Sequence, residues 1–190
     1  KKTTACFEPS IDYVVLKFPR WPFDKFVTAD RTLGTQMKAT GEVMAIERTL
    51  EAAMLKAIRS LEIGLTHLEM PELKELSDEE IRARISKIDD ERIFVVAEAL
   101  RRGVSLEEIN EITMIDRWFL QKILNIVKME TVLKTEPMTK EIMRKAKRMG
   151  FADVVIGEYI GKQMMEVRAM RKDWGIIPTY KMVDTCAAEF

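Results

Sequence analysis

The chain of 190 residues has few of the side chains that enzymes most often use as bases, nucleophiles and metal ligands. It contains one histidine and two cysteines, and the cysteines stand near opposite ends, at Cys6 and Cys186. A single histidine gives a serine or cysteine nucleophile no obvious base, and the cysteine spacing fits neither a disulfide framework nor a zinc site. We therefore expect two reduced thiols, as in a cytoplasmic protein, and neither a catalytic triad nor a metal centre.

Long apolar runs and an excess of one charge are also missing. No stretch reaches the roughly 18 apolar residues that a membrane-spanning helix needs, so we expect no membrane partner. Lysine and arginine number 31, as do aspartate and glutamate, and the resulting net charge of zero argues against nucleic-acid binding. The eight glycines are scattered and form no phosphate-binding loop, so no nucleotide site is indicated.

The first third of the chain has strand character. Residues 11–18 are rich in β-branched and aromatic side chains, and we expect this strand to stop at Pro19. Residues 42–46, opened by Gly41, form a second short strand candidate, and residues 27–35 are expected to form a loop between the two. Two strands without a covering layer are marginal in water, so we do not expect them to complete a sheet alone.

From Thr49 onward the apolar periodicity is helical. Capping residues and glycine stops divide this part into short helices, expected at about 50–61, 78–88, 91–102, 106–112, 117–133, 139–149, 152–160 and 163–174. Residues 65–76, which include His67 and a proline, are expected to form a solvated linker. The fold class is therefore mainly α: an irregular helical bundle with a short α/β segment at the N-terminus.

Three groups of acidic residues have the composition of acid–base pairs, but all lie where helices are predicted to begin. They occupy residues 78–80, 89–91 and 107–108, where carboxylates interact favourably with the helix dipole. The basic run at residues 144–148 lies near the end of a predicted helix, which favours a solvated face, with a phosphate or partner contact as the alternative. We therefore assign no catalytic, cofactor-binding or metal-binding residue.

Two aromatic residues indicate a surface more than a reactive site. Trp118 and Phe119 adjoin at the start of the longest predicted helix, directly after Asp116 and Arg117. Neighbouring helical residues point about 100° apart, so both rings cannot face one core centre. These four residues are structural or interface candidates, and core packing and a subunit contact both remain open for the two rings.

Residues 152–176 have the outline of a helix-turn-helix, with a short helix, Gly161 and a second helix. In a DNA-binding protein the second helix presents its side chains to the major groove. Here that helix carries Arg168, Arg171 and Lys172, but also acidic residues and the methionines Met164, Met165 and Met170. We interpret these methionines as core, with a partner surface as the alternative. A packed helical hairpin is favoured, and a stand-alone helical DNA-binding regulator is kept as the alternative function.

Several blocks of this sequence together resemble the large subunit of carbamoyl-phosphate synthetase. They are residues 7–15 (FEPSIDYVV), 37–46 (MKATGEVMAI), 113–120 (TMIDRWFL), 147–153 (KRMGFAD) and 183–190 (VDTCAAEF). The resemblance runs nearly end to end, and we would not expect these blocks together by chance. It covers the end of the first ATP-grasp half of that subunit and the helical oligomerisation domain that follows.

The resemblance implies that residues 1–62 are the tail of the carboxyphosphate ATP-grasp domain and residues 63–190 the oligomerisation domain. It implies a scaffold that connects the two synthetase halves and supplies subunit contacts. The parent enzyme makes carbamoyl phosphate from bicarbonate, ammonia and two ATP for arginine and pyrimidine synthesis, and uses ATP with magnesium or manganese and potassium. The matching ligands lie upstream in the family, so this segment is expected to hold no cofactor and to have no activity alone.

The partners implied by the resemblance are the remainder of the large subunit, its glutaminase small subunit and a second copy in a homo-oligomer, with no nucleic acid and no membrane. One position departs from the family pattern, because Glu47 stands where the family usually has glycine. If that position requires a positive φ, Glu47 costs on the order of 1 kcal/mol or forces a change in the backbone.

Overall fold

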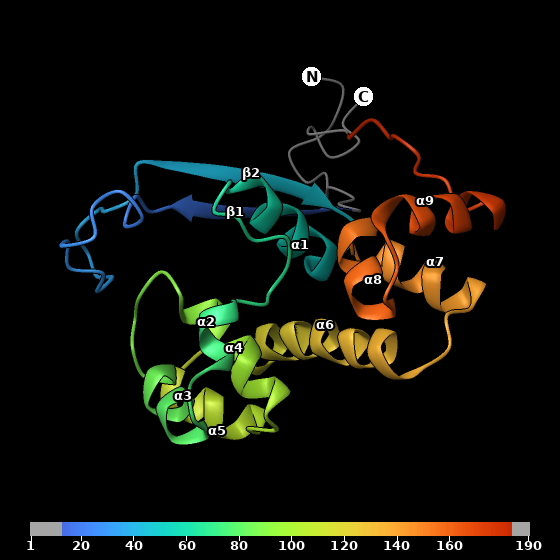
Figure 1. Cartoon of the computed structure of the whole chain (residues 1–190). Coiled ribbons are helices and arrows are strands. Elements are labelled where there is room, and N and C mark those ends of the chain that lie inside the picture. The colour runs from blue at the N-terminus through green and yellow to red at the C-terminus, as the bar shows by residue number, and fades with distance from the viewer. Residues whose placement is uncertain (1–12, 184–190) are drawn as a thin grey trace, which may run out of the picture.

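The computed structural model describes residues 13–183 and shows short helices beside a two-stranded sheet (Figure 1). Its elements are β1 Val14–Arg20, β2 Gly41–Glu47, α1 Leu50–Ser60, α2 Pro71–Lys74, α3 Asp78–Ile85, α4 Arg92–Arg101, α5 Leu106–Thr113, α6 Arg117–Thr135, α7 Lys140–Arg148, α8 Asp153–Ile160 and α9 Met164–Asp173. Cys6, Cys186 and most of the blocks at 7–15 and 183–190 lie outside the described residues. The mainly helical fold class is confirmed.

The sheet is an antiparallel hairpin of β1 and β2, in which Leu16 lies opposite Ala45 and Lys17 opposite Met44. Because side chains alternate along a strand, one face presents Phe18 and Ala45 to the core, and the other leaves Lys17 and Met44 exposed. Helix α1 packs against both strands. The two strands thus gain from α1 the covering layer that their own sequence does not supply.

The first strand does not stop at Pro19, as was expected from the sequence. β1 includes this proline and ends at Arg20. Within the described residues β1 pairs with β2 along one edge, and proline is compatible with a strand edge that donates no ladder hydrogen bond. Directly after the strand, Trp21 packs edge-to-face on Phe18 with ring centroids 6.4 Å apart, which anchors the start of the following loop.

Glu47 fits its position without a left-handed backbone. In residues 13–183, the non-glycine residues with a positive φ are Glu62 and Met114, whereas Glu47 is the last residue of β2. Its carboxylate pairs with Lys56 Nζ of α1 at 3.0 Å. The free-energy cost that Glu47 would carry at a position requiring a positive φ therefore does not arise.

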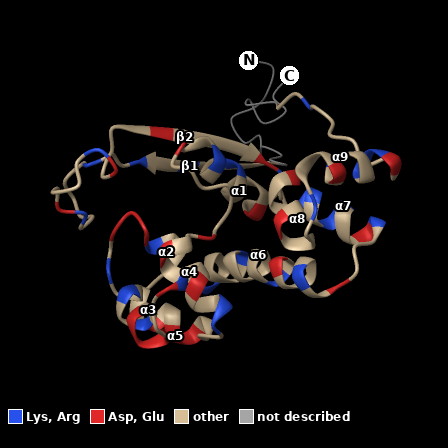
Figure 2. Ribbon diagram, in the orientation of Figure 1, with Lys and Arg blue, Asp and Glu red and all other residues tan. Residues whose placement is uncertain are grey.

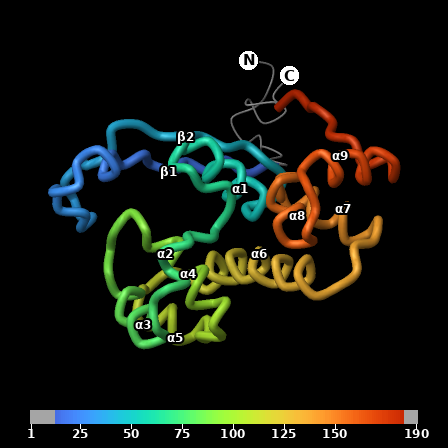
Figure 3. The backbone as a smooth tube through the Cα atoms, viewed as in Figure 1, coloured from blue at the N-terminus to red at the C-terminus, as the bar shows by residue number. Residues whose placement is uncertain are grey.

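Helix α6 is the element around which the other helices are arranged. It is 19 residues long and contacts α1, α4, α5, α7 and α8, as the backbone trace in Figure 3 shows. Because neighbours pack on more than one side of it, α6 buries more than a single apolar stripe. Its buried residues are Leu120, Ile123, Ile126, Val127, Met129, Glu130 and Leu133.

Side-chain caps close the N-termini of several helices, in agreement with the capping signals by which the sequence divides this part into helices. The side chains of Thr49, Ser77, Ser105 and Asp116 each accept a hydrogen bond from a backbone N–H in the first turn of the following helix. At α3 the box is reciprocal, because Glu80 also accepts a bond from the Ser77 N–H at 2.7 Å. Each cap satisfies a donor that the helix leaves open and contributes about 1 kcal/mol.

A close approach at Gly150 brings the end of α7 against the first turn of α1. Gly150 has a φ of +94°, and a Cβ there would lie 3.0 Å from Ala52 Cα. The Gly150 carbonyl accepts a hydrogen bond from Arg59 Nη1 at 2.9 Å. Both the backbone conformation and the available space therefore require glycine at this position.

Gly150→Ala should lower the free energy of unfolding by about 2–4 kcal/mol, because backbone strain and overpacking against Ala52 add together. Gly175→Ala is the matched control, since Gly175 has a φ of +68° but nothing within 4 Å of its Cβ position. That variant should lose about 1–2 kcal/mol from backbone strain alone. Urea unfolding followed by circular dichroism measures both, and equal losses would contradict a requirement for space at Gly150.

Candidate functional site

Two of the interface candidates form an exposed ring pair at the start of α6. Trp118 is 53% exposed and Phe119 is 49% exposed. Their rings pack edge-to-face with centroids 5.0 Å apart, and Lys122 Nζ lies 5.0 Å from the Trp118 ring centroid. Core packing, one of the two alternatives left open by the sequence, is therefore wrong for these rings.

Met114 extends this surface from the end of α5. It is the C-cap of α5 with a φ of 58°, and its side chain is 82% exposed. We call Met114, Trp118 and Phe119 the aromatic tip. Arg117 lies at its rim, with Nη1 3.8 Å from Glu107 Oε1. No local sequence signal indicates a left-handed methionine, a conformation that costs a non-glycine residue of order 1–2 kcal/mol.

Side-chain hydrogen bonds fix the turn that presents the aromatic tip. Asn110 Nδ2 donates to the Ile115 carbonyl at 2.8 Å, and the Thr113 hydroxyl accepts a bond from the Ile115 N–H at 3.1 Å. Asp116 accepts a bond from the Trp118 N–H at 2.8 Å, which caps α6. The rings therefore sit on an ordered backbone, and a partner that binds them has little local ordering to impose.

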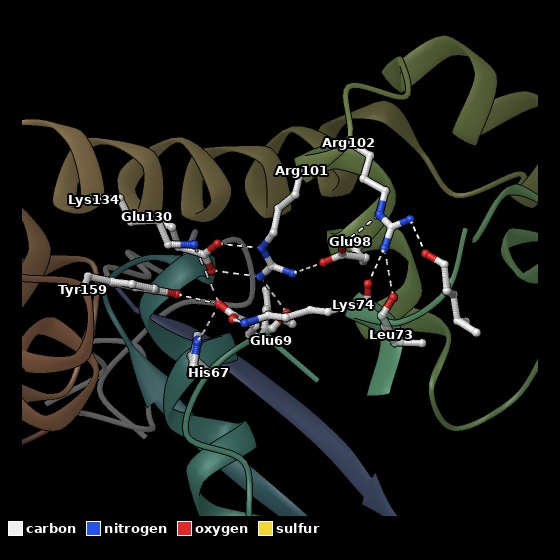
Figure 4. Close-up of polar contacts among 12 residues, drawn as sticks. His67, Glu69, Leu73, Lys74, Glu98, Arg101, Arg102, Glu130, Lys134 and Tyr159 are labelled. Carbon is white, nitrogen blue, oxygen red and sulfur yellow. Dashed lines mark hydrogen bonds and ion pairs between the residues drawn. The ribbon is translucent and has the colours of Figure 1, made fainter. Parts of the chain in front are cut away.

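A second cluster is buried and joins elements that are far apart in the sequence (Figure 4). Glu69 lies at its centre: His67 Nε2 is 3.3 Å from Glu69 Oε2, and the Tyr159 hydroxyl donates to the same oxygen at 3.1 Å. Lys74 pairs with the other carboxylate oxygen, Oε1, and Lys134 Nζ lies 4.0 Å from Oε2. This arrangement connects the segment before α2 to α6 and α8.

The expectation of a solvated linker around His67 is wrong. His67 is 8% exposed, and the backbone around it is held by two consecutive arginines at the end of α4. Arg101 Nη2 donates to the Leu68 carbonyl at 2.7 Å, and Arg102 Nη1 donates to the Leu76 carbonyl at 2.6 Å. These bonds satisfy carbonyls that no sheet or long helix would otherwise engage.

Arg101 also forms a buried ion pair with Glu130 of α6, which is 1% exposed. Both carboxylate oxygens are engaged, with Nε at 2.7 Å from Oε2 and Nη2 at 2.9 Å from Oε1. Glu98 of α4 lies 3.2 Å from the third guanidinium nitrogen. A bidentate guanidinium–carboxylate contact of this kind is directional, so it fixes α4 against α6.

Charges in this cluster shift the pKa values of its members. The hydrogen bond from His67, together with Lys74 and Lys134, holds the pKa of Glu69 well below its ordinary value despite burial. Burial, with the charges of Glu130 and Glu69, raises the pKa of the Tyr159 phenol, which therefore stays protonated and donates its hydrogen bond. In the part of the chain that is described, no three His, Cys, Asp or Glu residues are arranged to hold a metal ion.

The acidic group at 89–91 does more than precede a helix. Arg31, in the loop after β1, donates to both Asp90 oxygens at 2.8 Å, and Arg84 Nη2 donates to Glu91 at 2.6 Å. This group therefore ties the hairpin loop to the helical part, which the sequence analysis did not foresee. The groups at 78–80 and 107–108 lie in first helical turns, as expected.

Helices α8 and α9 form the expected packed hairpin but offer a poor DNA-reading surface. Arg171, one of its three basic residues, is buried and donates to Asp153 Oδ2 at 2.8 Å. Met164 and Met165, which we interpreted as core, are exposed instead. The outer face of α9 therefore mixes methionines with charges of both signs.

The fold and these two clusters define a class of domain: an irregular helical bundle beside a small hairpin, with an ordered aromatic tip at its surface. The family model described as "Carbamoyl-phosphate synthetase large chain, oligomerisation domain" matches residues 42–175. The chain belongs to this family. The resemblance found in the sequence is confirmed, and the DNA-binding alternative gains no support.

One relative shows how much of a longer protein the chain represents. The carbamoyl phosphate synthase large chain of Thermoanaerobacter sp. (strain X514) is 58% identical over 189 residues, which is 100% of this chain and 18% of that protein. The chain thus spans less than a fifth of the length of this relative. In residues 13–183, none of the helices combines the length and hydrophobicity of a membrane span.

Glu130→Gln should lower the free energy of unfolding by about 3 kcal/mol, the lower end of the range for breaking a buried ion pair, because Arg101 loses its bidentate partner but keeps Glu98 at 3.2 Å. Glu107→Gln, in the exposed pair with Arg117, should cost less than about 1 kcal/mol. Chemical denaturation of both variants provides the comparison. A loss below 1 kcal/mol for Glu130→Gln would mean that this pair does not hold α4 to α6.

The lowered pKa of Glu69 predicts a specific dependence of stability on pH. A carboxylate with a depressed folded-state pKa stabilises the fold above its ordinary value of 4.5, and this contribution is lost as pH falls through and below that value. The Glu69→Gln variant should therefore be less stable than the parent protein at pH 6, and this difference in stability should become smaller as the pH falls from 6 to 3. Urea midpoints across this range measure the difference, and a deficit that stays constant with pH would contradict the assignment.

Proposed function

We propose that the chain is a scaffold segment of a carbamoyl-phosphate synthase large subunit that supplies subunit contacts through the aromatic tip. Membership of the oligomerisation-domain family supports the scaffold role. The aromatic tip supports the contact, because exposed Trp, Phe and Met on ordered backbone have the composition of an interface centre.

The chemistry belongs to the parent enzyme in this proposal. That enzyme would make carbamoyl phosphate from bicarbonate, ammonia and two ATP, for arginine and pyrimidine synthesis, in the cytoplasm. ATP, magnesium or manganese, and potassium would bind elsewhere in the large subunit, and a glutaminase small subunit would be a further partner. The segment itself would do no chemistry. The boundary between residues 1–62 and 63–190 stays a prediction; the family model begins within β2, at residue 42.

A second copy of the chain is the occupant that fits the aromatic tip best. The family description names oligomerisation, and contacts between identical chains are commonly two-fold symmetric, so one patch meets its own copy. The tip suits such a contact because its rim carries both signs of charge, Arg117 and Glu107. Opposed copies would place each arginine near the other copy's glutamate.

The double variant Trp118→Ala/Phe119→Ala should weaken self-association by at least about 30-fold, as expected for loss of an interface hot spot worth about 2 kcal/mol. Light scattering across a concentration series measures this against the monomer mass of 22.0 kDa. Each single substitution should change the free energy of unfolding by less than about 1 kcal/mol, because both rings are half-exposed.

Met165→Ala removes an exposed apolar side chain from α9 and should leave the mass profile unchanged. A parent chain that stays monomeric at every concentration would overturn the assignment of a second copy. So would a double variant that associates like the parent. Either result would leave the aromatic tip as a contact for another part of the large subunit.

A further inference from the structure

A cavity of about 390 Å³ opens between the start of α1 and the last turns of α7. Arg144, Lys145 and Arg148 line it from α7, and Thr49, the N-cap of α1, lines it from the other side. We call this cavity the basic cleft. Its volume lies in the range of about 300–1,000 Å³ typical of small-molecule sites.

The cations of the basic cleft are not neutralised within the fold. Their neighbour in sequence, Lys147, has Asp153 at 2.7 Å. By contrast, no carboxylate of residues 13–183 lies within 4.0 Å of Arg144, Lys145 or Arg148. Acidic and basic residues are interspersed along the helices (Figure 2), and the basic cleft is lined by three cations from one helix.

Two carboxylates also line the cleft, but they leave it positive. Glu51 is buried, and its Oε1 is engaged by Asn125 Nδ2 at 2.8 Å and by Lys122 Nζ at 3.4 Å. Its charge is thus balanced by a lysine outside the cleft. Glu141 is exposed to solvent at the first turn of α7. The remaining balance favours an anionic ligand.

Another cavity, of about 450 Å³ beneath the hairpin loop, differs in this respect. Its arginines already have partners: Arg20 meets Asp24 at 2.7 Å, and Arg31 meets Asp90 at 2.8 Å. An anion entering there would compete with existing carboxylates. The basic cleft, although smaller, is the better anion site.

Glycine at position 150 gives the cleft its shape. A Cβ on Gly150 would lie only 3.0 Å from Ala52 Cα, so the glycine allows the backbone after α7 to pack against the first turn of α1. The end of α7 and Thr49 thereby line the same cleft. Arg144 and Arg148 are one helical turn apart and therefore share a face. Two guanidinium groups on one face can each offer parallel N–H donors to a phosphate, an arrangement that a lysine cannot reproduce.

We propose that the basic cleft binds a small phosphate-bearing molecule, with the phosphate held by Arg144 and Arg148 and an apolar portion against Met149. The volume exceeds what a phosphate alone would fill, and Met149 supplies apolar lining. This site is separate from the aromatic tip and goes beyond the scaffold role. The lining of the cleft defines the ligand only by class, as a phosphate monoester whose organic group is apolar.

Calorimetric titration of the 190-residue chain tests this site with two probes, inorganic phosphate and phenyl phosphate, at constant ionic strength set with potassium chloride. Both should bind saturably at one site, and phenyl phosphate should bind more tightly. Arg144→Ala/Arg148→Ala should weaken phenyl phosphate at least about tenfold, since each hydrogen bond to a charged group contributes enough for such a change. Arg148→Lys, which keeps the charge but not the fork, should lose part of the affinity.

The matched control is Arg168→Ala/Lys172→Ala on α9, which removes the same net charge from exposed positions outside the cleft. Absence of saturable binding, equal weakening in the control, or no weakening in the cleft variant would overturn the proposal. Binding of a polyglutamate peptide without either phosphate would also overturn it, in favour of docking by an acidic protein segment. Light scattering on the same samples measures self-association separately, so failure of the phosphate site can be told apart from failure of the proposed subunit contact.

Discussion

The fold depends on accommodating the charge of Glu130 inside the helical core. A carboxylate removed from water is tolerated only when a cation and hydrogen bonds replace its hydration. Arg101 supplies both, and the same guanidinium also reaches the Leu68 carbonyl and Glu98. Neutralising one buried charge therefore positions α4, α6 and the segment before α2 together. The adjoining cluster around Glu69 extends the same set of contacts to α8.

This constraint explains how an irregular bundle presents a well-defined surface. Helix α6 is held at its C-terminal half, where Glu130 and Lys134 meet their partners, whereas Trp118 and Phe119 at its N-terminal end are half-exposed. The bonds of Asn110 and Asp116 then order the backbone of that end. A polar network at one end of a helix and an apolar tip at the other are thus two consequences of how α6 is anchored.

Local signals were enough to locate eight of the helices in the described residues, because caps such as Thr49 and Asp116 act within one turn of the residues that they satisfy. They missed the short helix α2, which lies in the predicted linker and has no side-chain cap. The two strand segments and the family resemblance could also be anticipated, whereas the pairing of the strands in one hairpin was not predicted. Contacts between distant residues could not. Tyr159 and Glu69 are 90 positions apart, and nothing in the neighbourhood of either indicates the other. The exposure of Trp118 likewise depends on where α6 ends relative to other helices, a tertiary property that a hydrophobic pattern does not encode.

Lys122 occupies a position with consequences for communication across the domain. Its ammonium group lies 5.0 Å from the Trp118 ring centroid and 3.4 Å from Glu51 Oε1, so one side chain links a ring of the aromatic tip to a carboxylate that lines the basic cleft. A partner that covers Trp118 removes water from Lys122 and strengthens its attraction to Glu51. That change alters the potential felt by an anion in the cleft. If the proposed anion site and the proposed subunit contact are both occupied, thermodynamic reciprocity requires each to shift the other by the same free energy, and Lys122 would then couple assembly to ligand concentration.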